Sequence, residues 1–225
     1  MQHLMLKLKI GIVFLLLIFF RSTYSIAQQQ KPVSLQSGDL LFQNLECGPL
    51  CDAIEEVTKG YKGNKFSHIG LVYIKSDTTW IIEAIGKDVH LTPIDDFLRR
   101  SPHPVFIGRV KKQYHSLIPG ALTFALQQAG TPYDDVFLYD NGKYYCSELI
   151  YDAFKSSNHN KAFFQLEPMT FKKPGSKEFN PVWVAYYKNL NAPIPEGKPG
   201  CNPGGLSRSN KIEIIGEQSF TQRTQ

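Results

Sequence analysis

Hydrophobic and polar positions alternate most clearly in the middle of the chain. The segments FSHIGLVYI (66–74) and TWIIEAI (79–85) are rich in β-branched and aromatic residues, and the turn-forming residues Ser76 and Asp77 lie between them. Such a pattern predicts two strands joined as a β-hairpin.

Three other apolar segments also predict strands. GDLLF (38–42) is typical of a turn followed by a short buried strand, and PVFIGRV (104–110) predicts a strand after the hairpin. PVWVAYY (181–187) predicts a late strand because it combines β-branched and aromatic residues.

A spacing of three or four residues between apolar positions predicts three helices. The first covers 49–59, and the second covers 117–130 with Pro119 in its first turn. The third begins at Cys146 and continues to about Ser156. The first helix has Leu50, Ile54 and Val57 on one face, and the expected buried stripe of the third contains Leu149, Ile150, Ala153 and Phe154.

The order of these elements is strands, helix, helix and strand, which is typical of an α+β domain with helices packed on an antiparallel sheet. We expect one domain over 28–190, with no internal repeat. The Pro- and Gly-rich character that begins after it predicts that 191–225 is an irregular segment packed on the domain.

The N-terminal segment 1–27 has the pattern of a secretory signal peptide. Lys7 and Lys9 precede an unbroken apolar run over 10–20, and 25–27 (Ser-Ile-Ala) fits a cleavage site. The apolar run is shorter than the roughly 20 residues that span a bilayer. We therefore expect export to the periplasm or the medium, with Gln28 as the first residue of the mature protein.

The charge of the chain gives no reason to expect a nucleic-acid partner. The formal net charge is +5, and removal of Lys7, Lys9 and Arg21 with the signal peptide lowers it to +2, since 1–27 contains no acidic residue. A mature protein so close to neutral lacks the basic character that attracts nucleic acid.

The mature chain contains Cys47, Cys51, Cys146 and Cys201, which can pair completely in three ways. An oxidising compartment favours disulfides, and the sequence does not choose among the pairings. Cys47 and Cys51 lack the matching Cys or His pair of a zinc site, so we expect a local disulfide or two packed thiols. If Cys146 stays free, another cysteine must be unpaired or bonded to another chain.

The segment KYYCSELIYDAF (143–154) places Cys146 at the start of a predicted helix. The unpaired N–H groups and the positive end of the helix dipole favour a thiolate there, and the thiolate is the nucleophilic form. By position alone, a buried structural cysteine is the alternative.

His68 is the candidate general base. It lies in the middle of an apolar strand, where a titratable group is unusual unless the group lines a site. A hydrogen-bonded histidine of the core is the alternative. A cysteine at a helix start facing a histidine on a sheet is the arrangement that a cysteine nucleophile needs.

A third polar group is expected to orient the imidazole, and Glu83, Asp88 and His90 are the candidates. We favour Glu83, an acid within the apolar strand at 79–85. In the register considered next, Asp88 and His90 are expected to point to the other face.

The choice of Glu83 depends on the register of the hairpin. With Ser76 and Asp77 as a two-residue turn, His68 lies opposite Ile85 and diagonal to Glu83 on the same face. A turn one residue later moves Glu83 about 13 Å along the strand from His68.

These segments, in their order along the chain, resemble a known family. GDLLF, FSHIGLV, a strand with Glu83, TPYDDVF and YYCSELIYDAF resemble the circularly permuted branch of the papain-like NlpC-type cysteine hydrolases. The YiiX-like group is most similar, and the lecithin:retinol acyltransferase-like enzymes are more distant. In that branch the histidine strand precedes the cysteine helix, as His68 precedes Cys146. The resemblance covers roughly 37–157.

The resemblance implies a papain-like fold with Cys146 as nucleophile, His68 as base and Glu83 as the residue that orients the histidine. Tyr145 and Tyr144 are candidates for substrate binding or for donating a hydroxyl to the developing oxyanion, with simple packing as the alternative for at least one of them.

The segment TPYDD carries two further polar residues. Tyr133 and Asp134 resemble a family segment that precedes the cysteine helix. We expect Asp134 to cap a loop or helix rather than to act as an acid.

We expect an exported cysteine hydrolase or acyltransferase that forms a thioester from an amide or ester. Its partner is a cell-wall peptide or related small amide, or a lipid acyl group. The alternative is a non-catalytic module that binds peptide or lipid, in which Cys146 is unreactive or disulfide-bonded. Cys146, His68 and Glu83 are three mixed ligands without close spacing, so neither a metal nor another cofactor is expected.

Overall fold

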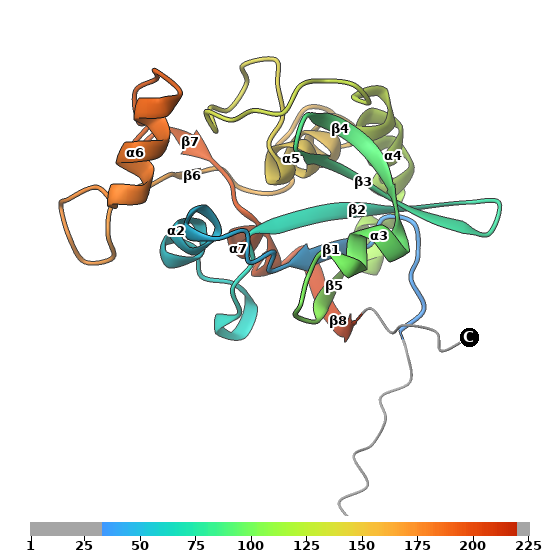
Figure 1. The fold of residues 1–225 in the computed structure, drawn as a ribbon. Coiled ribbons are helices and arrows are strands. Elements are labelled where there is room, and N and C mark those ends of the chain that lie inside the picture. Colours follow the sequence, from blue (N-terminus) through green and yellow to red (C-terminus); the bar gives the residue numbers. More distant parts are fainter. Residues whose placement is uncertain (1–32, 220–225) are drawn as a thin grey trace, which may run out of the picture. The chain divides into compact units, whose positions relative to one another are not determined.

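The computed structural model describes residues 33–219 and has an α+β fold (Figure 1). The predicted signal peptide, 1–27, lies outside the described residues. Over 33–219, none of the helices combines the length and the apolar character that crossing a membrane requires.

A six-stranded antiparallel sheet in the order β4-β3-β2-β1-β5-β8 is the framework of the domain. Every residue of β1, the strand between β2 and β5, is buried. The strands are β1 (Leu40–Gln43), β2 (His68–Lys75), β3 (Thr78–Ile85), β4 (Asp88–Pro93), β5 (Val105–Val110) and β8 (Ile212–Gln218). A second, two-stranded sheet joins β6 (Glu167–Pro168) to β7 (Pro199–Gly200).

The β2–β3 hairpin has the predicted register. Lys75 pairs with Thr78, so Ser76 and Asp77 form the turn. Both turn residues have positive φ, 48° and 61°, as a type I′ turn requires, and the twist of that turn matches the twist of the strands. The hairpin prediction is confirmed.

The chain reverses after β3 instead of continuing, which corrects one expectation. Gly86, with φ 63°, and Lys87 form a tight turn, and β4 then pairs with β3 so that Glu83 lies opposite His90. Residues that pair directly in antiparallel strands project to the same face. The expectation that Asp88 and His90 point away from the face of Glu83 is therefore wrong, because this turn reverses the alternation.

All three predicted helices are present, and their buried faces contact the sheet or its neighbours. Leu149, Ile150, Ala153 and Phe154 of the cysteine helix are buried, as predicted. Figure 1 shows α4 and α5 together on one side of the sheet. The helices are α2 (Pro49–Val57), α3 (Ile94–Arg99), α4 (Ile118–Gln127), α5 (Cys146–Ser157), α6 (Pro181–Asn189) and α7 (Pro203–Ser207), with 3-10 turns η1 (Tyr61–Gly63) and η2 (Lys112–Leu117).

The segment 181–187 is helical, so the predicted late strand is wrong. The side-chain oxygen of Asn180 accepts a hydrogen bond from the N–H of Val182, and Pro181 occupies the first turn of α6. Trp183 and Tyr187, four residues apart, are its buried residues. An Asn-Pro helix start and an aromatic pair at helical spacing outweigh the β-propensity of the individual residues.

The segment after residue 190 is more regular than expected. It forms α7 and then β8, which pairs with β5 at the edge of the main sheet. The expectation of an irregular segment over 191–225 is therefore wrong for these elements, although the segment does pack on the domain. Its Pro- and Gly-rich beginning concealed the short apolar strand that follows.

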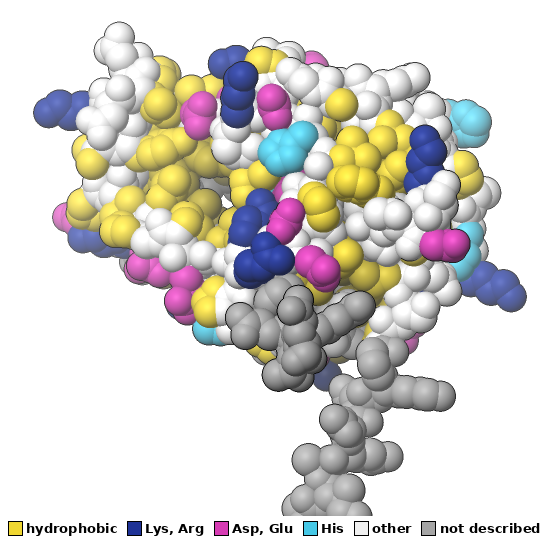
Figure 2. All heavy atoms as spheres, turned by 45° about the vertical axis from the view of Figure 1, so that its right-hand side comes forward, with side chains coloured by type: hydrophobic (Ala, Val, Ile, Leu, Met, Phe, Trp, Pro, Cys, Tyr) yellow, Lys and Arg dark blue, Asp and Glu magenta, His cyan; other side chains and the backbone are white. Residues whose placement is uncertain are grey.

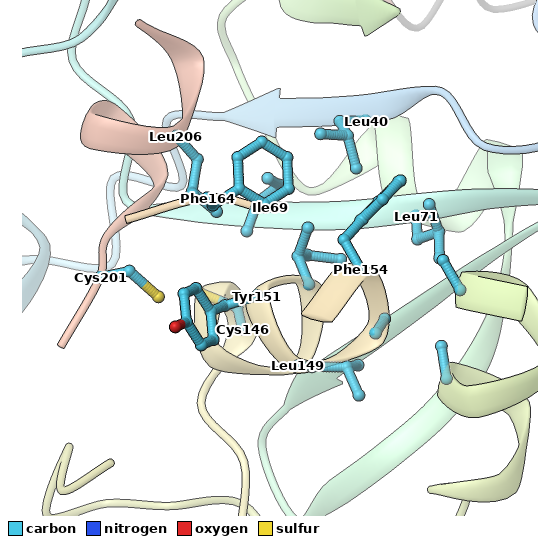
Figure 3. Packing of buried hydrophobic residues seen from close by; sticks show 14 of the residues in the cluster. Leu40, Ile69, Leu71, Cys146, Leu149, Tyr151, Phe154, Phe164, Cys201 and Leu206 are labelled. Carbon is cyan, nitrogen blue, oxygen red and sulfur yellow. The ribbon is translucent and has the colours of Figure 1, made fainter. Parts of the chain in front are cut away.

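The main hydrophobic core lies between the sheet and α4 and α5. Phe154 and Leu149 of α5 belong to one cluster with Leu40 of β1 and with Ile69 and Leu71 of β2 (Figure 3). A second cluster, which includes residues of α3, covers other positions of the same strands. A third, smaller cluster holds α6 against α2.

The four cysteines form one disulfide and two free thiols. Cys47 and Cys51 form a local disulfide, one of the two arrangements expected for them. Cys146 and Cys201 are free and buried.

Charged side chains of both signs are interspersed on one face of the molecule. In Figure 2, Lys and Arg lie beside Asp and Glu on the face shown, and neither sign forms a continuous field.

Candidate active site

Cys146 is the first residue of α5 and is 6% exposed. Glu148, in the first turn of this helix, accepts a hydrogen bond from the backbone N–H of Asp140 at 2.9 Å, which ties the start of the helix to the preceding loop. The thiol therefore lies at the positive end of the helix dipole, where a negative charge is favoured.

The structure brings Cys146, His68 and Glu83 together, as the sequence predicts. His68 is the first residue of β2, is buried, and forms a side-chain hydrogen bond with the thiol of Cys146. Its Nε2 lies 2.5 Å from Oε2 of Glu83, which leaves Nδ1 as the ring nitrogen for the sulfur. Glu83 is fully buried on β3, diagonal to His68 in the hairpin.

Arg100 is a member of the site that the sequence reasoning missed. Its Nη2 donates to both carboxylate oxygens of Glu83, each at 2.7 Å. Thr92 adds a side-chain hydrogen bond to the same carboxylate. Arg100 follows directly after α3, so its approach to Glu83 depends on how α3 packs, and no local pattern indicates it.

Phe97 of α3 lies beside both charged groups. The guanidinium of Arg100 lies 5.1 Å from the centroid of the Phe97 ring, and the His68 ring lies 5.9 Å from it. The side-chain amide of Gln43, which pairs with His68 across β1 and β2, donates to the carbonyl oxygen of Phe97 at 2.7 Å. These contacts restrict the motion of the imidazole.

The electrostatics of the site favour an imidazolium paired with a carboxylate. Burial opposes ionisation of Glu83, but the hydrogen bonds and positive charges of His68 and Arg100 lower the pKa of Glu83 to about 2. Burial likewise disfavours charged His68, but the hydrogen bonds and negative charges of Cys146 and Glu83 raise the pKa of His68 to about 9. At neutral pH the proton therefore resides on His68, and its charge attracts the thiolate form of Cys146.

A cavity of about 700 Å³ opens beside Cys146. The segment before α7 forms part of its wall, and Figure 3 shows Cys201 of that segment directed toward the start of α5. Much of the rest of the wall is apolar and aromatic. Six of the large apolar lining residues are Phe137, Phe163, Phe164, Phe171, Trp183 and Leu206.

The two tyrosines before the cysteine have different surroundings. Tyr145 lines the cavity, and its hydroxyl oxygen accepts a hydrogen bond from the backbone N–H of Cys201 at 3.2 Å. Tyr144 is not part of the lining; its ring packs edge-on against Phe124, and its hydroxyl is bonded to Asp152. The structure thus brings Tyr145 to the cavity and not Tyr144.

Tyr133 also lines the cavity and interacts electrostatically with Cys146. Burial, followed by the charge of Cys146, raises the pKa of Tyr133 above its ordinary value. No hydrogen-bond partner of its hydroxyl is found in the described part of the chain. The segment TPYDD was the signal that could have identified it.

Asp134 behaves as predicted. It is buried, and its carboxylate accepts hydrogen bonds from the N–H groups of Val136 at 3.1 Å and Leu138 at 2.6 Å. It therefore holds the loop before the cysteine helix. Asp88 and His90, the other candidates for orienting His68, bond to one another at 3.0 Å instead.

The described residues include no group of three or more His, Cys, Asp or Glu side chains that could hold a metal ion. Four side chains at the site instead form three successive contacts: thiol to imidazole, imidazole to carboxylate, and carboxylate to guanidinium.

Comparison with known proteins agrees with this fold. A protein of Escherichia coli K12, the uncharacterized protein YiiX, is 24% identical over 131 residues, which are 54% of this chain and 58% of that protein. The chain thus matches somewhat more than half the length of this relative. The crystal structure of the metalloprotein yiiX from Escherichia coli O157:H7 superposes with a TM-score of 0.65 at 19% identity, covering 82% of this chain and 98% of that one. At this identity the likeness shows the fold alone.

A family model described as the permuted papain-like amidase enzyme, YaeF/YiiX, C92 family, matches residues 34–216. The match extends from the segment before β1 into β8 and includes the histidine strand and the cysteine helix in their permuted order. The chain belongs to the C92 family of permuted papain-like amidases, the YaeF/YiiX group.

Proposed function

We propose that the protein is an exported cysteine amidase that cleaves a peptide or related amide through a thioester on Cys146. The observation that carries the proposal is the continuous series of contacts from Cys146 to His68 and from His68 to Glu83, beside a cavity large enough for a small substrate.

In the first half of the reaction, the thiolate of Cys146 attacks the carbonyl carbon of the amide. The negative charge that develops on the carbonyl oxygen is stabilised by the backbone N–H of Cys146 and by the hydroxyl of Tyr133, which has no competing partner within 33–219. His68 gives its proton to the amine as the C–N bond breaks, and the acyl group remains on the sulfur.

In the second half, neutral His68 removes a proton from an acceptor that attacks the thioester. Water as acceptor gives hydrolysis, and an alcohol or amine gives acyl transfer with the same residues. Because the family indicates an amidase, we propose water. The sulfur then leaves as a thiolate, and the imidazolium is restored beside it.

Glu83 and Arg100 act through His68. The carboxylate fixes the ring so that Nδ1 faces the sulfur, and its charge stabilises the imidazolium. Arg100 fixes the carboxylate in turn, since its Nη2 bonds both oxygens. Glu83 and Arg100 are thus positioning residues, whereas Cys146 and His68 touch the reacting atoms.

Export is supported by two independent features. The segment 1–27 has the composition of a signal peptide, and the disulfide between Cys47 and Cys51 is of a kind that persists in oxidising compartments.

A test of the nucleophile needs no substrate. The purified protein is treated with iodoacetamide between about pH 5 and pH 9, and the modified cysteine is located by mass spectrometry. We expect Cys146 to react near pH 6 much faster than a model thiol. His68→Ala is expected to remove this acceleration. A labelling rate no greater than that of the model thiol contradicts the proposal and favours a non-catalytic binding module.

A further inference from the structure

The cavity beside Cys146 carries an excess of positive charge. Lys59, Arg208 and Lys211 line it, whereas Glu167 is its acidic lining residue. Lys59 and Arg208 are exposed, and over 33–219 neither has an ion-pair partner. Lys211 is engaged with aromatic rings: its Nζ lies 4.9 Å from the centroid of Tyr114 and 5.8 Å from that of Phe163. Lys59 and Arg208 are therefore the cations available to a bound molecule.

Both cations are held near the same short helix. Gly204 of α7 packs closely against Lys59, which lies two residues after α2. A Cβ placed on Gly204 would be 3.2 Å from the backbone carbonyl carbon of Lys59. Arg208 directly follows α7. Their side chains therefore belong to one region of the cavity wall.

The reacting sulfur lies toward the other end of α7. Cys201 precedes this helix, and its N–H is bonded to Tyr145, the neighbour of Cys146. The five residues of α7 span about 7.5 Å at a rise of about 1.5 Å per residue and, with Asn202, separate Cys201 from Arg208. Aromatic and aliphatic side chains, including Phe163, Phe164 and Leu206, line the same cavity.

We infer that the substrate is an anionic amide: an acyl or peptidyl compound with an apolar or aromatic group near the scissile bond and a carboxylate that Lys59 and Arg208 bind. This inference rests on the proposed function and adds to it the substrate class. Unpaired cations beside apolar walls favour a ligand that combines a negative charge with a hydrophobic body. A carboxylate suits Arg208 because a guanidinium can donate two hydrogen bonds to it.

The test uses two alkylating probes of equal size and different charge. N-bromoacetyl-phenylalanine carries a free carboxylate, and N-bromoacetyl-phenylalaninamide is its neutral counterpart. In both, the Cys146 sulfur attacks the CH₂ carbon, an S–C bond forms, the C–Br bond breaks, and bromide leaves with the bonding electrons. We expect the acid to modify Cys146 about tenfold faster than the amide at low salt, with the preference falling as salt is added.

Reversing the charge of Arg208 tests whether this residue causes the preference for the acid. Arg208→Glu is expected to abolish or invert it, and Arg208→Lys to retain most of it. Lys75→Glu is the matched control, because Lys75 is an exposed lysine at the far end of β2 and is not part of the lining. Circular dichroism confirms that each variant is folded.

The outcomes separate the inference from the proposed function. If neither probe modifies Cys146, the proposed nucleophile is wrong and the substrate class fails with it. If both probes modify Cys146 at equal rates, or if Arg208→Glu and Lys75→Glu behave alike, the nucleophile stands and the anionic substrate class is overturned. Protection by N-acetyl-phenylalanine but not by its amide gives a second readout that does not require alkylation by a charged reagent.

Discussion

Nε2 of His68 lies 2.5 Å from Oε2 of Glu83, and the two residues are diagonal to one another across the β2–β3 hairpin. Burial alone would keep the His68 ring neutral and the Glu83 carboxyl group protonated. Each group makes the charged form of the other favourable, so the pair is stable only as an ion pair or as a unit sharing one proton.

Glu83→Gln is expected to slow labelling of Cys146 at about pH 6 and to move the labelling profile to higher pH. The charge of Glu83 helps to hold the pKa of His68 at about 9, so removal of the charge lowers it. Because an imidazolium beside the sulfur favours the thiolate, a neutral ring leaves Cys146 as the less reactive thiol. The measurement is the rate of iodoacetamide labelling of Cys146 from about pH 6 to pH 10 in both proteins. An unchanged pH profile would mean that Glu83 does not govern the imidazole.

The same pair predicts how the free energy of unfolding depends on pH. The lowered pKa of Glu83, about 2, contributes stability that is present above the unfolded value near 4.5 and is lost as pH falls toward 2. The raised pKa of His68, about 9, contributes stability that is present below the unfolded value near 6.5 and is lost as pH rises toward 9. Denaturant unfolding should therefore show greatest stability between about pH 4.5 and pH 6.5. A control with Glu83→Gln and His68→Gln together should flatten both flanks.

Arg100 and Arg99 are adjacent in sequence but form ion pairs with different carboxylates. Arg100 bonds the buried carboxylate of Glu83, whereas Arg99 bonds Asp96, and both members of that pair are more than half exposed. Arg100→Gln leaves a buried charge short of a partner and is expected to destabilise the fold by about 2 to 3 kcal/mol. Arg99→Gln is expected to cost less than about 0.5 kcal/mol.

The effect of Arg100 on the reaction is separable from its effect on stability. Without the guanidinium, Glu83 stays ionised beside His68 while a positive charge near the imidazolium is lost, so the pKa of His68 rises and Arg100→Gln should shift the labelling profile of Cys146 in the opposite direction to Glu83→Gln. Arg99→Gln should leave the profile in place. Loss of stability without this shift would assign Arg100 a structural role only.

The proximity of Cys146, His68 and Glu83 could be predicted from the sequence because the position of each depends on local patterns. The turn at Ser76 and Asp77 determines the register that brings His68 to Glu83, and the periodicity after Cys146 determines where its helix begins. Arg100 could not be predicted in this way, since it reaches Glu83 only through the packing of α3. The cavity is likewise a tertiary feature, because its walls come from segments far apart in the chain.

The incorrect predictions of secondary structure have local causes, which outweighed the hydrophobic pattern and the strand propensity of the residues. In 181–187, the β-propensity of the residues concealed a helix start set by Asn180 and an aromatic pair at helical spacing. β4 and β8 were missed because one follows a tight turn and the other follows a Pro- and Gly-rich segment. In each case a capping or turn residue, rather than propensity, determined the structure.

Cys201 is expected to remain unmodified under conditions that label Cys146. It is buried, and burial raises the pKa of its thiol well above the ordinary value. Its backbone N–H is bonded to the hydroxyl of Tyr145. Mass spectrometry after brief treatment with iodoacetamide at about pH 7 should find the label on Cys146 alone, and on both thiols after unfolding. Cys201→Ser should not change the labelling rate of Cys146 by more than about twofold, and prior labelling of Cys201 would contradict its burial.

Glu148 is expected to be neutral in the folded protein and to act as a neutral cap of the loop that precedes the cysteine helix. Its carboxyl group accepts a hydrogen bond from the backbone N–H of Asp140 at 2.9 Å, and burial with the charges of Asp134 and Asp152 raises the pKa of Glu148 to about 8. Because the unfolded value lies near 4.5, the folded protein loses stability as pH rises from about 4.5 to about 8. Gln keeps an acceptor oxygen and cannot ionise, so Glu148→Gln should be nearly neutral near pH 5 and more stable than the wild type near pH 9.

Glu148→Ala separates the hydrogen bond from the charge. It removes the bond to the N–H of Asp140 and should destabilise the fold at about pH 5 by about 1 to 2 kcal/mol. It should also slow labelling of Cys146, because fraying of the first turn of α5 displaces the thiol from the imidazole. Denaturant unfolding and labelling rates for the three proteins at about pH 5 and pH 9 test these expectations together. If Glu148→Gln is less stable than the wild type at both pH values, the carboxyl is ionised in the folded protein and the neutral cap is wrong.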